Sequence, residues 1–255
     1  MFLTSDNEQN LLKNFDSIGL KNKTKNKDVL IKINIARGYT KNHPRTDIAL
    51  LKTLVKYTHQ NGGTCAITEG CNGYLTENLI ASGFEDMLKE YRIKVIDADL
   101  EDCEEVISYG ESHYIPKCFR EYSTRIAVPA TSKREGMIYS NNVKLFFGAV
   151  PRRMYQLDNK NASIGTPRPK LHVDLYSSVA NLFLAIQKYS PFQFYVNGGL
   201  SYNENKGEFV LPKTYVGNDA LELDYHMFKS FFSDCTYPDY LNILQARLSD
   251  DKVCK

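Results

Sequence analysis

The chain has 255 residues, of which 42% are hydrophobic and 24% are charged, and its net charge is +2 at pH 7. These are ordinary values for a globular protein, and they argue against a protein dedicated to nucleic acid or to membrane surfaces. The first ten residues lack the basic and apolar regions of a signal peptide, and no apolar run approaches the roughly 18 residues that span a bilayer. We therefore expect a cytoplasmic protein with neither a membrane nor a nucleic acid as partner.

Six cysteines are scattered along the chain without a Cys-x-x-Cys pair. Six cysteines in an exported protein could form three disulfides, but nothing here signals export, so we expect reduced thiols. The five histidines lack the spacings typical of metal sites, and we expect no metal. The sequence identifies no cofactor and no oligomeric state.

The first half of the chain alternates predicted strands and helices. Residues 1–27 form a polar extension or a packing helix. Strands are then predicted at 28–35, 64–70 and 94–98, and helices at 47–61 and 76–91. This order predicts a parallel sheet with right-handed crossovers.

The second half is less regular. Strands are predicted at 125–129, 192–196 and 209–211, helical segments at 142–147, 175–186, 220–231 and after 238, and a long loop at 152–170. We predict an α/β fold with a mostly parallel sheet and helices on both faces. Residues 28–235 would form one domain, and residues 236–255 a C-terminal helix or tail.

Polar side chains follow several of the predicted strands. They are Lys32, Asn34, Arg37, Glu69, Lys133, Arg134 and Asn197. Ligands of open α/β sheets bind in the crevice beyond the carboxyl ends of the strands, so these residues are candidates for a shared site. The alternative is that they only cap helices and satisfy loop backbones.

Two further residues stand in apolar surroundings. Lys144 lies in an amphipathic patch, where a half-buried lysine can act as base, electrophile or anion clamp, or can reach out to solvent. Asp224 lies on the apolar face of a predicted helix. A buried carboxylate needs donors, so Asp224 either binds loop N–H groups or takes part in chemistry.

Several stretches resemble, in order, the family catalogued as domain of unknown function 362. The matching segments are Lys32–Asn34, Thr46–Asp47, Glu69–Gly70, Val128–Lys133, Lys144–Pro151, His172–Asp174, Asn197–Gly198 with Gly207, and Ala220–Asp224. The resemblance covers roughly residues 28–232. It implies that Lys144, His172 and Asp224 belong to the site, and that Gly198 lies in a binding loop.

The chain departs from the family pattern at four places. Leu145 stands where the motif has asparagine, Asn197 stands for aspartate, and Arg134 stands where a histidine usually follows the loop lysine. Many relatives also carry a ferredoxin-like iron–sulfur segment, and this chain has no matching cysteine run. We therefore do not expect this chain to handle electrons.

These observations favour a small-molecule enzyme of specialised metabolism with an anionic substrate that carries carboxylate or phosphate. Lys133, Arg134 and Lys144 would hold charge, and Glu69, His172 or Asp224 would move protons. The competing hypothesis is a non-catalytic accessory protein that holds an anion or a partner. A third hypothesis, RNA binding through the basic segment 131–170, has less support, since aromatic and basic residues are sparsely interleaved there.

Overall fold

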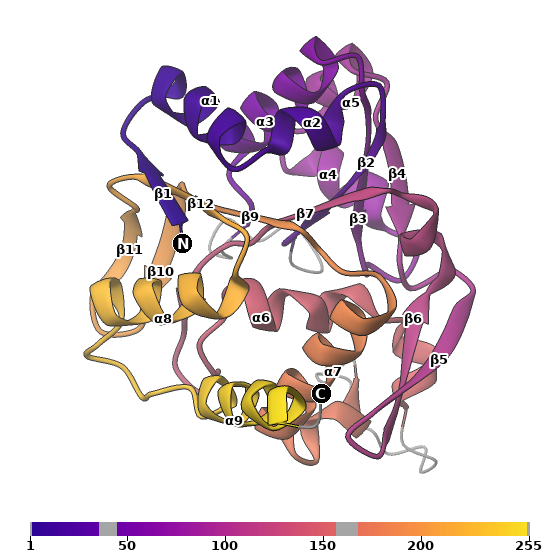
Figure 1. The fold of residues 1–255 in the computed structure, drawn as a ribbon, viewed down its shortest axis with the longest axis vertical. Helices are drawn as coiled ribbons and strands as arrows, with labels where there is room; N and C mark the ends of the chain where they lie inside the picture. Colours follow the sequence, from indigo (N-terminus) through magenta and orange to yellow (C-terminus); the bar gives the residue numbers. More distant parts are fainter. Residues whose placement is uncertain (1, 36–44, 157–167, 254–255) are drawn as a thin grey trace.

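The computed structural model of the chain describes residues 2–35, 45–156 and 168–253 (Figure 1). Its central sheet has seven strands in the order β1-β12-β9-β7-β2-β3-β4. Their bounds are β1 Phe2–Ser5, β12 Thr214–Gly217, β9 Phe194–Asn197, β7 Thr124–Val128, β2 Asp28–Ile33, β3 Thr64–Glu69 and β4 Lys94–Asp97. Strands β2, β3, β4, β7 and β9 are parallel, whereas β12 runs antiparallel to both β9 and β1.

The helices are mostly amphipathic, and aspartates cap three of them. Their bounds are α1 Glu8–Ser17, α2 Leu20–Thr24, α3 Ile48–Gln60, α4 Leu75–Ala81, α5 Glu85–Glu90, α6 Asn142–Leu145, α7 Leu175–Tyr189, α8 Ala220–Phe231 and α9 Tyr240–Val253. Four short 3-10 helices are η1 Lys117–Glu121, η2 Phe146–Ala149, η3 Arg152–Tyr155 and η4 Pro169–His172. Asp47, Asp174 and Asp219 accept backbone N–H groups at the starts of α3, α7 and α8.

Successive residues along each central strand belong alternately to two hydrophobic cores. Val29, Ile31 and Ile33 of β2 belong to the core that includes α1, α3, α4 and α5. Leu30 belongs to the other core, which includes α7, α8 and α9. Figure 1 shows α1, α2 and α3 on one side of the strands and α6, α8 and α9 on the other. Each fully buried Ile or Leu contributes about 1.5–3 kcal/mol, so the alternation fixes the register of β2.

The prediction of an α/β fold with a mostly parallel sheet is confirmed. All five strands predicted at 28–35, 64–70, 94–98, 125–129 and 192–196 lie in the central sheet. The strands β1 and β12, which complete one edge, were not predicted. The strand predicted at 209–211 falls on β11, Gly207–Val210, which pairs with β10, Leu200–Asn203, in a separate three-stranded sheet with β8, Ser132–Lys133.

One predicted helix is wrong, and one predicted loop contains short helical turns in its described parts, while residues 157–167 of that loop lie outside the described residues. The single helix expected over 76–91 is broken into α4 and α5, because Gly83 adopts a left-handed conformation with φ of +87°. Ile80, assigned to its core stripe, is 44% exposed. The described parts of the loop expected over 152–170 contain η3 and η4.

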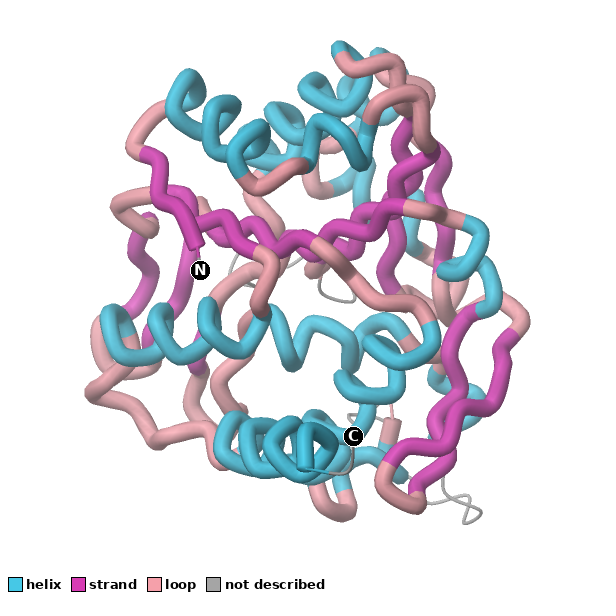
Figure 2. Tube along the Cα trace, in the orientation of Figure 1, coloured by secondary structure: helices cyan, strands magenta, loops and turns pink. Residues whose placement is uncertain are grey.

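A hairpin of β5, Cys103–Ser108, and β6, Glu111–Pro116, was also missed. It forms its own two-stranded sheet, packs against α7, and stands apart from the central sheet in Figure 2. The five cysteines within the described residues are free thiols, and Cys254 lies outside them. None of the described helices is long and apolar enough to cross a lipid bilayer.

Candidate functional site

The carboxyl ends of the parallel strands meet at one edge of the sheet. Pairing of β9, β7, β2, β3 and β4 in that order brings the ends of these strands, including Glu69 and Asn197, to this edge. Thr46 joins two of the strand ends, since its hydroxyl accepts the N–H of Asn34 (2.8 Å) and donates to the carbonyl of Val128 (2.5 Å). The edge is therefore held together by side chains as well as by the sheet.

One group at this edge, here called the charge cluster, consists of Lys32, Glu69, Asp99, Arg152 and Arg168. At its centre, Nζ of Lys32 lies 2.8 Å from Oε2 of Glu69, and Lys32 is 0% exposed. Burial lowers the pKa of Lys32 and raises the pKa of Glu69, while their mutual attraction opposes both shifts. The pair is isolated from solvent, so each charge depends on the other.

Two glycines allow η2 to approach this pair. The N–H of Gly70 donates to the carbonyl of Gly148 over 2.8 Å. A Cβ atom at Gly148 would overlap with Oε1 of Glu69. The glycine in the segment Lys144–Pro151 therefore serves a close backbone contact with a buried carboxylate.

Asp99 organises the rest of the charge cluster. Its carboxylate accepts the backbone N–H of Arg152 (2.8 Å) and lies 3.0 Å from Nε of the same residue. Nη2 of Arg168 lies 3.3 Å from Asp99, and its Nε donates to the carbonyl of Val150. The cluster contains three cations and two carboxylates, so its formal charge is positive.

Asp97 and Asp99 also shape the turn that follows β3. Asp97 accepts the N–H groups of Cys71 (3.0 Å) and Gly73 (2.7 Å), and Asp99 accepts that of Asn72 (2.8 Å). These bonds account for backbone donors that would otherwise be unsatisfied. They also explain why two carboxylates can stand together at the end of β4.

A second group, here called the amide network, consists of Thr131, Asn141, Asn142, Asn197 and Asp224. Oδ1 of Asp224 accepts the backbone N–H (3.0 Å) and the side-chain amide (2.9 Å) of Asn142, and Oδ2 accepts the N–H of Val143 (3.0 Å). Burial raises the pKa of Asp224 to about 7, although these hydrogen bonds act to lower it. Asp224 thus binds backbone N–H groups, as one of its two interpretations required, but these groups belong to the first two residues of α6 and not to a loop.

The amides extend the network to the end of β9. Oδ1 of Asn197 accepts the side-chain amide of Asn142 (3.0 Å), and Oδ1 of Asn141 accepts from Asn197 and from Thr131. Within the described part of the chain, Nδ2 of Asn141, Oδ1 of Asn142 and the hydroxyl of Tyr139 are buried without a hydrogen-bond partner. The network therefore retains hydrogen-bonding capacity.

Lys144 lies on the segment that joins the two groups, between Asn142 in the amide network and Gly148 beside Glu69. It is half-buried, and its Nζ lies 5.9 Å from the ring centroid of Phe147. No hydrogen bond or ion pair joins this ammonium to another described residue. Loss of hydration lowers its pKa to about 8.

His172 borders the same segment. It is exposed, its ring lies edge-on to Phe147 with centroids 5.4 Å apart, and its Nδ1 is 2.9 Å from the carbonyl oxygen of Arg168. The charge cluster, the segment with Lys144, and His172 are thus linked by direct contacts.

The remaining predicted residues lie elsewhere or are engaged. Lys133, in β8 of the three-stranded sheet, pairs with Glu204 over 2.6 Å. The guanidinium of Arg134 stacks on the ring of Tyr202, in β10 of the same sheet, at 4.5 Å. Gly198 packs against α3, since a Cβ there would lie 3.0 Å from the side chain of Leu50. Arg37 lies outside the described residues.

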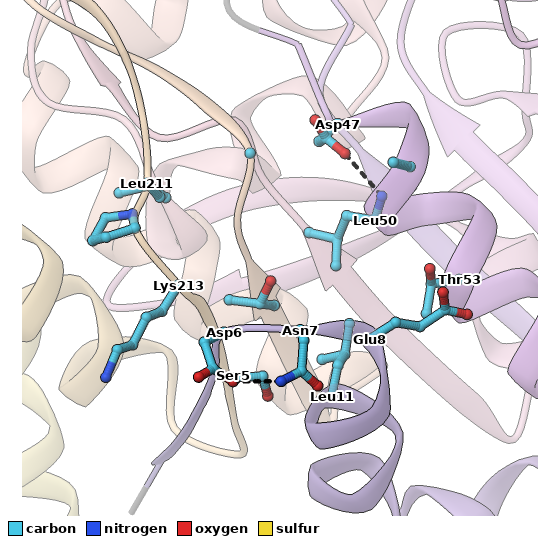
Figure 3. Close-up of a pocket in the computed structure, with 14 residues that line it drawn as sticks. Ser5, Asp6, Asn7, Glu8, Leu11, Asp47, Leu50, Thr53, Leu211 and Lys213 are labelled. Atoms are coloured by element: carbon cyan, nitrogen blue, oxygen red, sulfur yellow. Dashed lines mark hydrogen bonds between the residues drawn. The ribbon is translucent and has the colours of Figure 1, made fainter.

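A polar pocket of about 330 Å³ lies where α1 and α3 begin and β12 approaches them (Figure 3). Among the residues that the structure describes, Asp6, Glu8 and Asp47 line it, against the one cation Lys213. This sign of charge does not suit an anionic ligand. Among the residues that are described, no cluster of His, Cys, Asp and Glu could hold a metal ion.

The sequence-based interpretation missed Asp97, Asp99, Arg168, Asn141 and Asn142. The strand prediction at 94–98 contained Asp97 one residue before its end, which was a usable signal. Consecutive arginines such as Arg152 and Arg153 can form a phosphate fork or a solvated pair, but both are engaged here. Arg152 binds Asp99 and the carbonyl of Gly70, and Arg153 donates to the carbonyls of Asp99 and Glu101.

Comparison with known protein families gives a match over most of the chain. The family model described as "Domain of unknown function (DUF362)" matches residues 29–229. No curated protein matches the chain.

Proposed function

Since the chain belongs to the domain of unknown function family DUF362, whose name assigns no activity, we propose a function from the chemistry of the sheet edge. The chain is a small-molecule enzyme of specialised metabolism, and its substrate carries a carboxylate or phosphate. The substrate occupies the crevice at the carboxyl ends of the strands. The observation that carries this proposal is the half-buried amine of Lys144, which pairs with none of the other residues that the structure describes.

An amine with a pKa near 8 suits both roles that an anionic substrate requires. Its protonated form attracts the substrate, and its neutral fraction near pH 7.5 can accept a proton. The positive formal charge of the charge cluster adds to this attraction, and its internal pairing keeps Lys32 and Arg168 in fixed positions. In this proposal Lys144 contacts the substrate, while Glu69 and Asp224 hold the surrounding backbone in place.

The proposal also rests on how the sheet is covered. Alternate residues of β2 enter two different cores, which supports helices on both faces of the sheet. With both faces covered, the strand ends are where a ligand reaches the polar groups of the sheet. His172, exposed beside Phe147, is then a second candidate for proton transfer.

The competing function is a non-catalytic accessory protein that holds an anion or a partner. The pairing of Lys32 with Glu69 and of Lys133 with Glu204 favours it, because these cations are already neutralised. The lowered pKa of Lys144 favours the enzyme, since a binding protein does not need it.

Pyridoxal 5′-phosphate, an anionic aldehyde, tests the proposal. It condenses with neutral amines, and borohydride then fixes the adduct for peptide mass spectrometry. At pH 7.5 an amine with a pKa near 8 has on the order of 100-fold more neutral form than an ordinary lysine. We expect Lys144 to be labelled first, and inorganic phosphate or acetate to protect it.

Two variants control this experiment. Lys144→Arg keeps the charge and should abolish the preferred label, whereas Lys188→Arg, at an exposed position on α7, should leave it unchanged. Labelling spread evenly over surface lysines would refute the proposal. Protection by anions without any turnover of a carboxylate or phosphate library would favour the accessory protein.

A further inference from the structure

A separate pocket lies between the β5–β6 hairpin and the start of α7, and none of its lining residues belongs to the charge cluster or the amide network. Its volume is about 390 Å³, and residues of β6, η3, η4 and the first turn of α7 line it. Pockets that hold small organic molecules commonly measure about 300–1,000 Å³. The size therefore suits a compact organic ligand.

The walls of this pocket are largely apolar and aromatic. Met154 and Leu171 form part of the lining, together with Val173, which is 80% exposed. Tyr114 and Tyr155 add two rings whose centroids are 5.9 Å apart in an edge-to-face arrangement. The hydroxyl of Tyr155 accepts the N–H of Tyr114 (2.8 Å), so this hydroxyl is already hydrogen-bonded within the pocket wall. Aromatic rings and a thioether favour an aromatic ligand.

His113 is the polar group of this pocket that lacks a partner. The residue is 1% exposed, and neither ring nitrogen has a hydrogen-bond partner in the described structure. The nearest carboxylate, that of Glu111, is 3.7 Å from Nε2, which is beyond hydrogen-bond distance. Burial lowers the pKa of His113, so its ring is neutral and offers one donor and one acceptor.

The described charged residues around the pocket do not favour an anion as its ligand. Among them, Glu111, Asp174 and Lys170 line it, which gives two carboxylates against one ammonium. Asp174 is engaged as the cap of α7. The ligand of this pocket therefore differs in charge from the anionic substrate proposed for the sheet edge.

We propose that this pocket binds a small neutral aromatic molecule whose hydroxyl or amide group forms a hydrogen bond with His113. Such a group supplies the donor or acceptor that the buried imidazole lacks, and the ring fills the apolar wall. The site is independent of the function proposed for the strand ends, and neither depends on the other.

Two probes of nearly equal shape test the hydrogen bond. 4-Fluorophenol carries a hydroxyl where 4-fluorotoluene carries a methyl group, and ¹⁹F NMR titration gives the dissociation constant of each. The wild-type protein should bind 4-fluorophenol about fivefold more tightly, because one buried hydrogen bond is gained. The ¹³C-methyl signal of Met154 reports whether the probe occupies this pocket.

The His113→Phe variant should bring the ratio of the two dissociation constants to about one. The matched control is His59→Phe, since His59 also has a buried unpartnered ring nitrogen but does not line this pocket. That control should keep the wild-type ratio.

Val173→Trp covers the case in which His113→Phe fails to fold, since an exposed rim position tolerates substitution. It should obstruct the pocket and weaken both probes. Equal binding of the two probes to the wild type, an unmoved Met154 signal, or binding unaffected by Val173→Trp would each overturn the proposal.

Discussion

The charge cluster and the amide network bury polar groups at the same sheet edge, but they satisfy them in different ways. In the charge cluster, Lys32 and Glu69 compensate each other over 2.8 Å, and Asp99 is flanked by two arginines. In the amide network, the single carboxylate of Asp224 is surrounded by neutral N–H donors. Attraction between Lys32 and Glu69 opposes the pKa shifts that burial causes in both, whereas neutral donors leave the pKa of Asp224 at about 7.

This difference predicts two kinds of response to substitution. The charge cluster should be sensitive to loss of one partner and tolerant of losing both. The amide network should instead be sensitive to pH. Lys144, which lies between them, is then the position where a substitution alters binding with little effect on folding.

The largest expected effect is the loss of one member of the buried pair. Lys32→Met or Glu69→Gln alone should each lower the free energy of unfolding by about 3–5 kcal/mol, because an uncompensated buried charge remains. The double variant should be more stable than either single variant. Urea denaturation monitored by circular dichroism measures all three.

The exposed pair of Lys52 and Glu90, at 2.9 Å, provides the matched control. Lys52→Met should leave the free energy of unfolding nearly unchanged, since solvent screens that pair. If the double variant of Lys32 and Glu69 were the least stable of all, the pair would not be the compensating unit described above.

Asp224→Asn should have the next largest effect. It should lower the free energy of unfolding by about 2–3 kcal/mol at pH 8, because an amide donor then faces the N–H groups of Asn142 and Val143. The pKa of Asp224 in the folded protein, about 7, lies above its ordinary value of 3.8. Between these values the folded protein binds more protons than the unfolded chain, so its stability from this group rises as pH falls from 8 towards 5.

The amide that Asp224→Asn introduces cannot take up the proton, so the stability gap to the wild type should widen as pH falls. Denaturation at pH 5, 6, 7 and 8 measures this. Asp174→Asn is the control, since asparagine also caps a helix and should leave the pH slope unchanged. A gap that narrows towards pH 5 would contradict the assigned pKa shift.

Gly148→Ala should have the smallest of the three effects, about 1–3 kcal/mol, from the clash of its Cβ with Glu69. The clash should disappear when Glu69 is truncated, so Gly148→Ala should cost little in a Lys32→Met/Glu69→Ala background. Gly19→Ala is the control. Gly19 has a φ of +81° and no neighbour within 4 Å, so its cost should be equal in both backgrounds.

Local patterns in the sequence predicted the central strands well, because apolar alternation depends on neighbouring residues. The exceptions have physical reasons. The hairpin β5–β6 has exposed acidic residues, such as Glu104 and Glu105, in place of a regular apolar face. Strand β1 has only four residues, and it pairs with β12 near the other end of the chain. A break such as that at Gly83 depends on one dihedral angle that the apolar period does not reveal.

Proximity at the sheet edge could be predicted, but the pairing of charges could not. Lys32 and Glu69 end neighbouring parallel strands, so their closeness follows from the topology. Lys133 meets Glu204 only because β8 pairs with β10, a contact without any local signal. The proposed site therefore loses Lys133 as a free cation and retains Lys144.

The position of β1 has a consequence for synthesis of the chain on the ribosome. Phe2 of β1 pairs with Gly217 of β12, so β1 has no strand to pair with until β12 has been made. At about 5–20 residues per second, that wait is roughly 10–40 s. During this time β2, β3, β4 and β7 can already pair with one another, while the edge that β1 and β12 complete stays open. β9 is made only shortly before β12, so chaperone contact during translation should concentrate on β7, the strand that borders the open edge until β9 is added.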